Sequence, residues 1–218
     1  MAAKRIAAIA GSTGLVGRQL IEQLLDSTRY TDVHAIGRRA PHIVHRKLHL
    51  IASDLRTMPP LPAIDDAFCC LGTTINKAGS QAALRTVDFD MVLHFAKAAK
   101  KAGAMRFLVV SALGANAKSS VFYNRVKGEM EQALRDLDFK SLTIFRPSLL
   151  VGERAEARMG ERVGIAVFSA LAPLMIGPAR KVRPVEAKAV ARAMFAAAAN
   201  DVTGVSAVES DEIAGLTG

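Results

Sequence analysis

The stretch AGSTGLVGR at residues 10–18 directly follows the apolar run RIAAIA and opens a segment whose apolar residues have helical spacing. Its three glycines, Gly11, Gly14 and Gly17, recur every third residue. In this arrangement Gly11 closes a strand, Gly14 keeps the turn open to a phosphate, and Gly17 lets the helix pack closely on the strand. The stretch therefore predicts the phosphate-binding turn of a dinucleotide fold. A plain joint between a strand and a helix is the alternative.

Apolar runs and segments of helical spacing alternate along the chain. Short β-branched or apolar runs, which predict strands, occur at 5–10, 33–37, 47–52, 66–71, 106–111, 141–146 and 205–209. Apolar residues at helical spacing occur at 15–27, 80–103, 119–137 and 184–200. This alternation predicts an α/β fold, a doubly wound parallel sheet of about seven strands with helices on both faces. Only the short connector at 38–46 leaves no room for a crossover helix.

Composition and charge limit the partners. The chain has 218 residues, half of them apolar, which suits a single domain over residues 1–218. Its formal charge of +9 is scattered, and only 5% of residues are aromatic, so a phosphate-bearing small molecule is expected rather than nucleic acid. No apolar window reaches the roughly 18–20 residues that a bilayer requires, so no stable membrane insertion is expected. The longest, at 163–177, contains Pro173 and reads as a buried or surface-docking helix.

The end of the second predicted strand indicates which dinucleotide is bound. In dinucleotide folds an acid at this place binds the 2′-hydroxyl of NAD, whereas an arginine suits the 2′-phosphate of NADP. This chain has Arg38 and Arg39 there, and no acid before Asp54. Because a guanidinium fork matches a phosphate, NADP is favoured over NAD. Two solvated arginines at the start of a loop are the alternative.

Three residues in the second half of the chain suit proton transfer. Tyr123 and Lys127 lie four apart in a helical segment, and Ser111 ends the preceding strand, at the edge where parallel sheets bind ligands. A neighbouring ammonium lowers the pKa of a tyrosine toward the useful range, and serine can polarise a substrate oxygen. Together these groups would exchange a proton with a carbonyl oxygen while a nicotinamide exchanges hydride with its carbon. The alternative is an ordinary helix with surface and core residues.

Other polar residues carry no predicted function. The histidines His42, His45 and His49 cluster on a short connector and strand that would not bring them onto one ion, so no metal site is expected. Asp65 and Asp66 read as solvated turn residues. The adjacent cysteines at 69–70 read as buried, reduced thiols, as expected for a cytoplasmic protein, and a strained redox disulfide is the alternative.

The segments GSTGLVG, IGRR, FCCLGTT, VVSALGA, YNRVK, VKGE and FRPSLLVG occur in order from the start of the chain to beyond residue 146. Their combination resembles the short-chain dehydrogenase/reductase superfamily, in its atypical branch near the nucleotide-sugar epimerases. FCCLGTT with the nearby KAG, then VKGE and FRP, is most similar to the animal Tat-interacting protein family of NADPH-binding, reductase-like proteins and their small bacterial relatives. The similarity spans residues 6 to about 197.

The resemblance implies a site. By likeness to the family, the catalytic residues are Ser111, Tyr123 and Lys127. The implied cofactor contacts are Gly11, Ser12, Thr13, Gly14, Leu15 and Val16 at the pyrophosphate, Arg38 and Arg39 at the 2′-phosphate, Asp54 and Leu55 at the adenine, Leu71, Gly72 and Thr73 under the ribose, Tyr123 and Lys127, and Pro147 and Ser148 on the nicotinamide side.

The chain departs from the family pattern in two places. Asp88 stands where the family often has an asparagine that holds the water of a proton relay, so that relay is not carried over. A counterpart of the sizeable substrate domain of the sugar epimerases is not expected, and residues 152–184 read as a small substrate-lid insertion near the C-terminal end.

The leading hypothesis is an NADPH-dependent oxidoreductase acting on a small carbonyl or alcohol substrate, expected to form a homodimer. A dinucleotide sensor that regulates a protein partner, and an epimerase or dehydratase that uses the nicotinamide transiently, are the alternatives.

Overall fold

A computed structural model describes residues 4–152, 183–200 and 202–215. Within them, seven parallel strands form one sheet in the order β3-β2-β1-β4-β5-β6-β9. The strands are β1 (Arg5–Ala10), β2 (Tyr30–Gly37), β3 (Leu48–Ala52), β4 (Asp66–Cys69), β5 (Arg106–Val110), β6 (Ser141–Arg146) and β9 (Gly204–Glu209). The doubly wound α/β fold is therefore confirmed, and β2 and β3 are joined without a helix, as expected.

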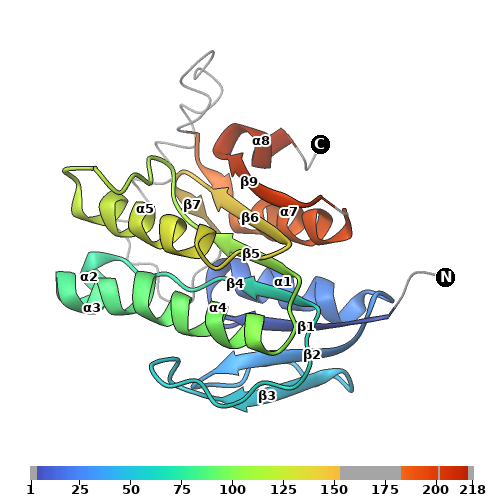
Figure 1. Cartoon of the computed structure of the whole chain (residues 1–218). Coiled ribbons are helices and arrows are strands. Elements are labelled where there is room, and N and C mark those ends of the chain that lie inside the picture. The colour runs from blue at the N-terminus through green and yellow to red at the C-terminus, as the bar shows by residue number, and fades with distance from the viewer. Residues whose placement is uncertain (1–3, 153–182, 201, 216–218) are drawn as a thin grey trace.

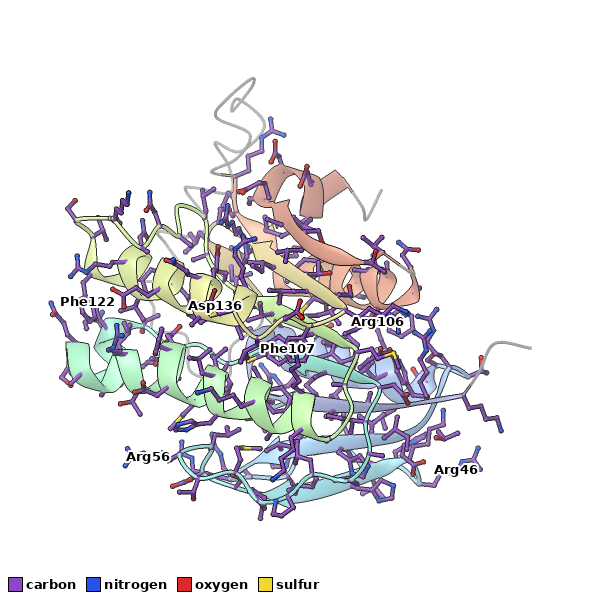
Figure 2. All side chains as sticks on the ribbon, in the orientation of Figure 1. Arg46, Arg56, Arg106, Phe107, Phe122 and Asp136 are labelled. Atoms are coloured by element: carbon purple, nitrogen blue, oxygen red, sulfur yellow. The ribbon has the colours of Figure 1, made fainter. Side chains whose placement is uncertain are left out.

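Helices cover both faces of this sheet (Figure 1). They are α1 (Leu15–Asp26), α2 (Ile75–Ala78), α3 (Gln81–Arg85), the π-helical turn η1 (Thr86–Asp90), α4 (Met91–Lys101), α5 (Phe122–Arg135), α7 (Ala187–Ala199) and α8 (Ser210–Gly215). Side chains of α1 and α7 form one buried core with one face, and those of α4 and α5 form a second core with the other. On the second face the ring of Phe107 of β5, labelled in Figure 2, packs between the rings of Phe95 and Phe139.

The structure differs from the sequence-based expectation in a few elements. The helix predicted over 80–103 is observed as the consecutive elements α3, η1 and α4, with a π-helical turn in the middle of the segment. A second, two-stranded sheet joins β7 (Leu150–Val151) to β8 (Val185–Glu186), and α8 follows β9. The predicted lid over 152–184 lies almost entirely outside the described residues, and the apolar segment 163–177 lies entirely outside them.

The prediction that Asp65 and Asp66 are solvated turn residues is wrong for Asp66, whereas Asp65 lies half-buried in a bend before β4. Asp66 begins β4 and is fully buried. Its carboxylate accepts a 2.8 Å hydrogen bond from the Tyr30 hydroxyl and pairs with Arg106 at 3.2 Å. Asp65 accepts the backbone N–H of Ile6 at 2.7 Å. Since these partners lie far away in sequence, local turn chemistry gave no sign of them.

The strand order reverses at β1, because β2 lies on one side of it and β4 on the other. A crevice opens at such a reversal, beyond the carboxyl ends of the strands, and it is where doubly wound sheets bind ligands. The glycine-rich turn between β1 and α1 lies at this point. Gly11 has φ +82°, and a Cβ there would lie 2.6 Å from the Cys70 carbonyl oxygen.

Gly17 is expected to be the glycine least tolerant of a side chain. A Cβ at this position would lie 2.1 Å from the Gly11 carbonyl oxygen, so the helix would have to move away from the turn. Gly17→Ala should therefore lower the free energy of unfolding by about 2–3 kcal/mol, measured by urea denaturation. Gly37→Ala is the matched control, because its Cβ would meet nothing closer than 3.9 Å. Equal stability of the two variants would contradict the close packing of α1 on the turn.

Candidate active site

A cavity of about 1090 Å³ opens at the carboxyl edge of the sheet. Its walls come from the segments that follow β1, β2, β4, β5 and β6, together with the first turns of α5. This is the place at which the strand order predicts a ligand. Its volume is at the upper end of the range for small-molecule sites, about 300–1,000 Å³.

Most of the predicted site residues line this cavity. They are Thr13, Gly14, Leu15, Val16, Arg39, Leu71, Gly72, Thr73, Ser111, Tyr123, Lys127, Pro147 and Ser148. The turn, one of the two arginines and the three candidate catalytic residues therefore border one continuous space. The remaining predicted contacts, Gly11, Ser12, Arg38, Asp54 and Leu55, do not line it.

The two predicted adenine contacts have other local roles. The Asp54 carboxylate accepts the backbone N–H groups of Arg56 at 2.9 Å and Thr57 at 3.3 Å, and these bonds lower its pKa. Leu55 has φ +64° and buries its side chain in the core beside α4. Both residues thus stabilise the turn after β3, and neither lines the cavity.

The helix α5 supplies three functional side chains at four-residue spacing. Tyr123, Lys127 and Glu131 lie one turn apart and so share one side of the helix. Lys127 and Glu131 are both almost completely buried. Gly128 lets the preceding loop cross α5 closely, since a Cβ there would lie 2.1 Å from the Ala117 nitrogen. The stripe therefore faces the ends of the strands rather than solvent.

Lys127 forms an ion pair with Asp88 of η1, with 2.8 Å between Nζ and Oδ1. Lys127 Nζ also donates to the Val110 carbonyl at 3.3 Å, and Asp88 Oδ2 accepts the Thr73 backbone N–H at 2.9 Å. Burial lowers the pKa of Lys127, but the Asp88 carboxylate and, less strongly, Tyr123 raise it, and the net direction is upward. The lysine is thus held as a cation.

The expectation that Lys127 lowers the pKa of Tyr123 is correct only as one contribution. Burial raises the pKa of the phenol, the Lys127 ammonium lowers it, and the Asp88 carboxylate raises it. The net direction is upward from the ordinary value of about 10. In this structure Tyr123 is therefore a neutral phenol at physiological pH, which suits a proton donor.

Ser111 lies at the end of β5 and is bound by a partner that the sequence did not predict. Its hydroxyl donates a 2.6 Å hydrogen bond to Glu131 Oε1. The same carboxylate pairs with Arg146 of β6, at 3.0 Å and 2.5 Å, and Arg146 also reaches Glu209 at 2.9 Å. A serine has one proton to donate, so this hydroxyl must turn away from Glu131 before it can donate to a substrate oxygen.

Several residues that line or support the cavity were missed by sequence reasoning. At the glycine-turn end these include Arg18, Glu22, Pro41, His42 and Ile43, and near α5 they include Ile75, Leu84, Leu113, Leu149 and Leu150. The helical period could have found Glu131, which continues the spacing of Tyr123 and Lys127. No comparable signal marks Asp88 as the partner of Lys127.

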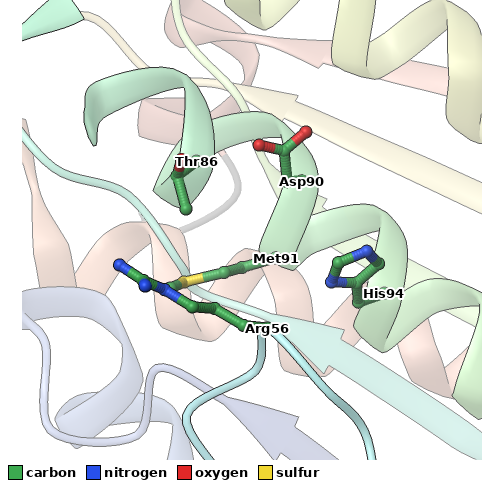
Figure 3. Close-up of a pocket in the computed structure, with 5 residues that line it drawn as sticks. All are labelled: Arg56, Thr86, Asp90, Met91 and His94. Atoms are coloured by element: carbon green, nitrogen blue, oxygen red, sulfur yellow. The ribbon is translucent and has the colours of Figure 1, made fainter. Parts of the chain in front are cut away.

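A second, smaller cavity of about 340 Å³ lies beside η1 and the start of α4 (Figure 3). It is lined by Arg56, Thr86, Asp90, Met91 and His94. His94 Nδ1 lies 3.2 Å from the Leu55 carbonyl oxygen, which ties this cavity to the turn after β3. Neither the glycine turn nor the Tyr123 stripe borders it, so it is not the candidate active site.

Metal-binding groups and membrane-spanning helices are both absent from the described part of the chain. Over those residues, no three histidine, cysteine or acidic side chains are grouped so that they could hold a metal. Nor does any helix described there have the length and apolar character needed to cross a bilayer.

Comparison with known proteins places the chain in a family. The model of the NAD(P)H-binding family matches residues 11–201. The chain therefore belongs to this family. Its resemblance to the atypical short-chain dehydrogenases/reductases, and in particular to the Tat-interacting protein family, is confirmed.

Two curated relatives cover most of the chain. The protein HTATIP2 of Rattus norvegicus is 35% identical over 170 residues, which are 75% of this chain and 70% of the relative. The mitochondrial protein fmp52 of Emericella nidulans is 35% identical over 168 residues, 72% of this chain and 71% of the relative.

Solved structures share the fold at low sequence identity. MoeE5, in complex with UDP-glucose and NAD, has a TM-score of 0.69 at 17% identity and covers 97% of this chain and 81% of its own. A short chain dehydrogenase family protein from Francisella tularensis has a TM-score of 0.67 at 14% identity, covering 97% of this chain and all of its own. At this identity the likeness is one of fold.

Proposed function

We propose that the protein is an NADPH-dependent oxidoreductase that transfers hydride between the cofactor and a small carbonyl or alcohol compound. The observation that carries this proposal is the shared cavity, which the glycine turn, Arg39, Tyr123 and Lys127 all border. A dinucleotide lying along it would place its phosphates at the start of α1 and its nicotinamide beside α5.

Each residue then has a defined task in reduction. A bound NADPH would supply the hydride for the carbonyl carbon. Tyr123 donates the proton to the carbonyl oxygen, because its phenol is neutral and borders the cavity. Lys127, held in place by Asp88, borders the cavity one helical turn from Tyr123. Ser111 orients the substrate oxygen once its hydroxyl turns from Glu131.

One observation favours a second candidate, a dinucleotide-binding protein that regulates a partner without turnover. Two of the three catalytic candidates are engaged within the protein, Ser111 by Glu131 and Lys127 by Asp88. Incubation with NADPH and a panel of aldehydes and ketones separates the two. An oxidoreductase consumes NADPH only when a carbonyl compound is present, and no consumption with any member of the panel, despite tight NADPH binding, would favour the regulatory protein.

We propose NADP(H) rather than NAD(H) as the cofactor, on the strength of Arg39. This guanidinium lines the cavity and matches a 2′-phosphate. The wild-type protein is expected to bind NADPH at least about tenfold more tightly than NADH, and Arg39→Ala should remove most of this preference, as measured by titration calorimetry.

Arg38→Ala is the matched control for Arg39→Ala. Arg38 precedes Arg39 in the chain and is exposed, but it does not line the cavity. The Arg38→Ala variant should bind NADPH within about twofold of the wild type. Equal affinity of the wild-type protein for NADPH and NADH would refute the assignment.

The homodimer, the cytoplasmic location and the substrate lid stay predictions.

A further inference from the structure

The ion pair between Lys127 and Asp88 is sealed within the protein at the wall of the cavity. Lys127 is 2% exposed and Asp88 is fully buried, so solvent screens their 2.8 Å contact very little. A Cβ added to Gly72, which lines the cavity, would lie 3.5 Å from Asp88 Oδ1 and 3.8 Å from Lys127 Nζ. The pair therefore lies directly behind Gly72, and Lys127 itself borders the cavity proposed for the cofactor.

The local structure is built to bring Asp88 to this place. Asp88 lies in the middle of η1, and π-helical turns inside helices often mark functional sites. Its second carboxylate oxygen holds the Thr73 backbone N–H at 2.9 Å, which ties the segment after β4 to the same carboxylate. Asp90, two residues later, lines the separate cavity near Arg56 and His94 (Figure 3). Asp88 thus pairs with Lys127 at the large cavity, whereas Asp90 lines the smaller one.

Asp88 and Lys127 are the two charges that act on the Tyr123 phenol. From α5 itself, Lys127 lies one turn away from Tyr123, and Asp88 comes from η1. The charges of Glu131 on α5 and Arg146 on β6 pair with each other, and Ser111 at the end of β5 is neutral. On β4, burial raises the pKa of the Cys69 thiol to about 12, so this group is neutral as well.

We propose that Asp88 is a positioning residue that cancels the charge of Lys127 at Tyr123, keeps the tyrosine a neutral proton donor, and so suits the site to carbonyl reduction at neutral pH. In an ordinary tyrosine–lysine pair, the uncompensated ammonium favours the phenolate, which is the form that accepts a proton from an alcohol. Here the carboxylate returns the local charge of the pair to zero, and burial then favours the neutral phenol.

The role in carbonyl reduction rests on the proposed function, whereas the protonation of Tyr123 can be tested without any substrate. The chain has two tyrosines and no tryptophan. Tyr30 is buried and hydrogen-bonded to Asp66, and both raise its pKa far above the ordinary value. In the folded protein, the near-ultraviolet absorbance of tyrosinate therefore reports Tyr123 alone.

The experiment is a pH titration of tyrosinate absorbance in the wild-type protein and in Asp88→Asn. The wild-type transition is expected above the ordinary tyrosine pKa of about 10. In Asp88→Asn the unopposed Lys127 should move it down by about one pH unit or more. Circular dichroism of the same samples defines the folded range, and Tyr123→Phe, which lacks the group, supplies the blank. If Asp88→Asn does not fold, Asp88→Ser replaces it.

Asp90→Asn is the matched control, because it removes the same charge from the same turn but faces the other cavity. Its transition should coincide with that of the wild type. A wild-type transition below pH 10, or coincident transitions in the wild type and in the Asp88 variant, would overturn the inference. If Asp88→Asn shifts the transition but the protein never oxidises NADPH, the role of Asp88 stands and the proposed function fails.

Discussion

Tyr123→Phe is expected to lower the turnover of a carbonyl compound by about 10² to 10⁴, the usual contribution of a positioned proton donor. Within the described residues the Tyr123 hydroxyl makes no hydrogen bond, so its removal breaks no contact that supports the fold. The ring of phenylalanine would still pack at the start of α5. The loss should therefore appear in kcat, measured as NADPH consumption with the substrate found by the carbonyl panel.

Two further measurements on this variant separate a chemical effect from a structural one. Thermal unfolding and NADPH affinity should stay close to the wild-type values, since the glycine turn and Arg39 lie at the other end of the cavity. Full activity of Tyr123→Phe on a substrate that the wild type reduces would show that another group donates the proton.

Lys127→Met is expected to be the most destabilising of the substitutions considered. It removes the cation and leaves the Asp88 carboxylate fully buried without its ionic partner. Breaking a buried pair in this way costs about 3–5 kcal/mol, because the remaining charge has lost both water and its counter-ion. The free energy of unfolding, measured by urea denaturation at neutral pH, should fall by about this amount.

The double variant Lys127→Met/Asp88→Asn is the matched control. It removes both charges and leaves an amide oxygen that can still accept the Thr73 N–H. Most of the lost stability should return, whereas NADPH turnover should not. If the double variant is as unstable as Lys127→Met, the loss comes from packing of the lysine stem rather than from the unpaired carboxylate.

Most of the fold could be predicted from the sequence because its strands and helices follow local patterns of apolar residues. The strands β1, β4 and β5 are apolar after their first, charged residue, and α1 shows helical spacing from its first turn. Such periodicities are visible without knowledge of distant partners. The π-helical turn at residues 86–90 was not predictable in this way, because it leaves the apolar pattern almost unchanged.

The candidate site was predicted less completely, for a physical reason. Ser111, Tyr123 and Lys127 are recognisable because their residue types and spacing suit proton transfer. Their partners are charged residues that local patterns assign to solvent, and only tertiary structure buries them. Asp88 meets Lys127 across 39 positions, and Glu131 meets Arg146 across 15. These partners change the chemistry. The Asp88 carboxylate adds to the upward shift that burial gives the pKa of Tyr123, and Glu131 accepts the hydroxyl proton of Ser111 in a hydrogen bond.

We propose that one cavity holds NADP(H) with its nicotinamide beside Tyr123, and the decisive measurement is a crystal structure of the protein with bound NADP⁺. We expect the pyrophosphate at the backbone N–H groups that follow Gly11, the 2′-phosphate within hydrogen-bond reach of Arg39, and the nicotinamide next to Tyr123 and Lys127. Electron density that places the cofactor elsewhere, or that turns the nicotinamide away from Tyr123, would contradict it.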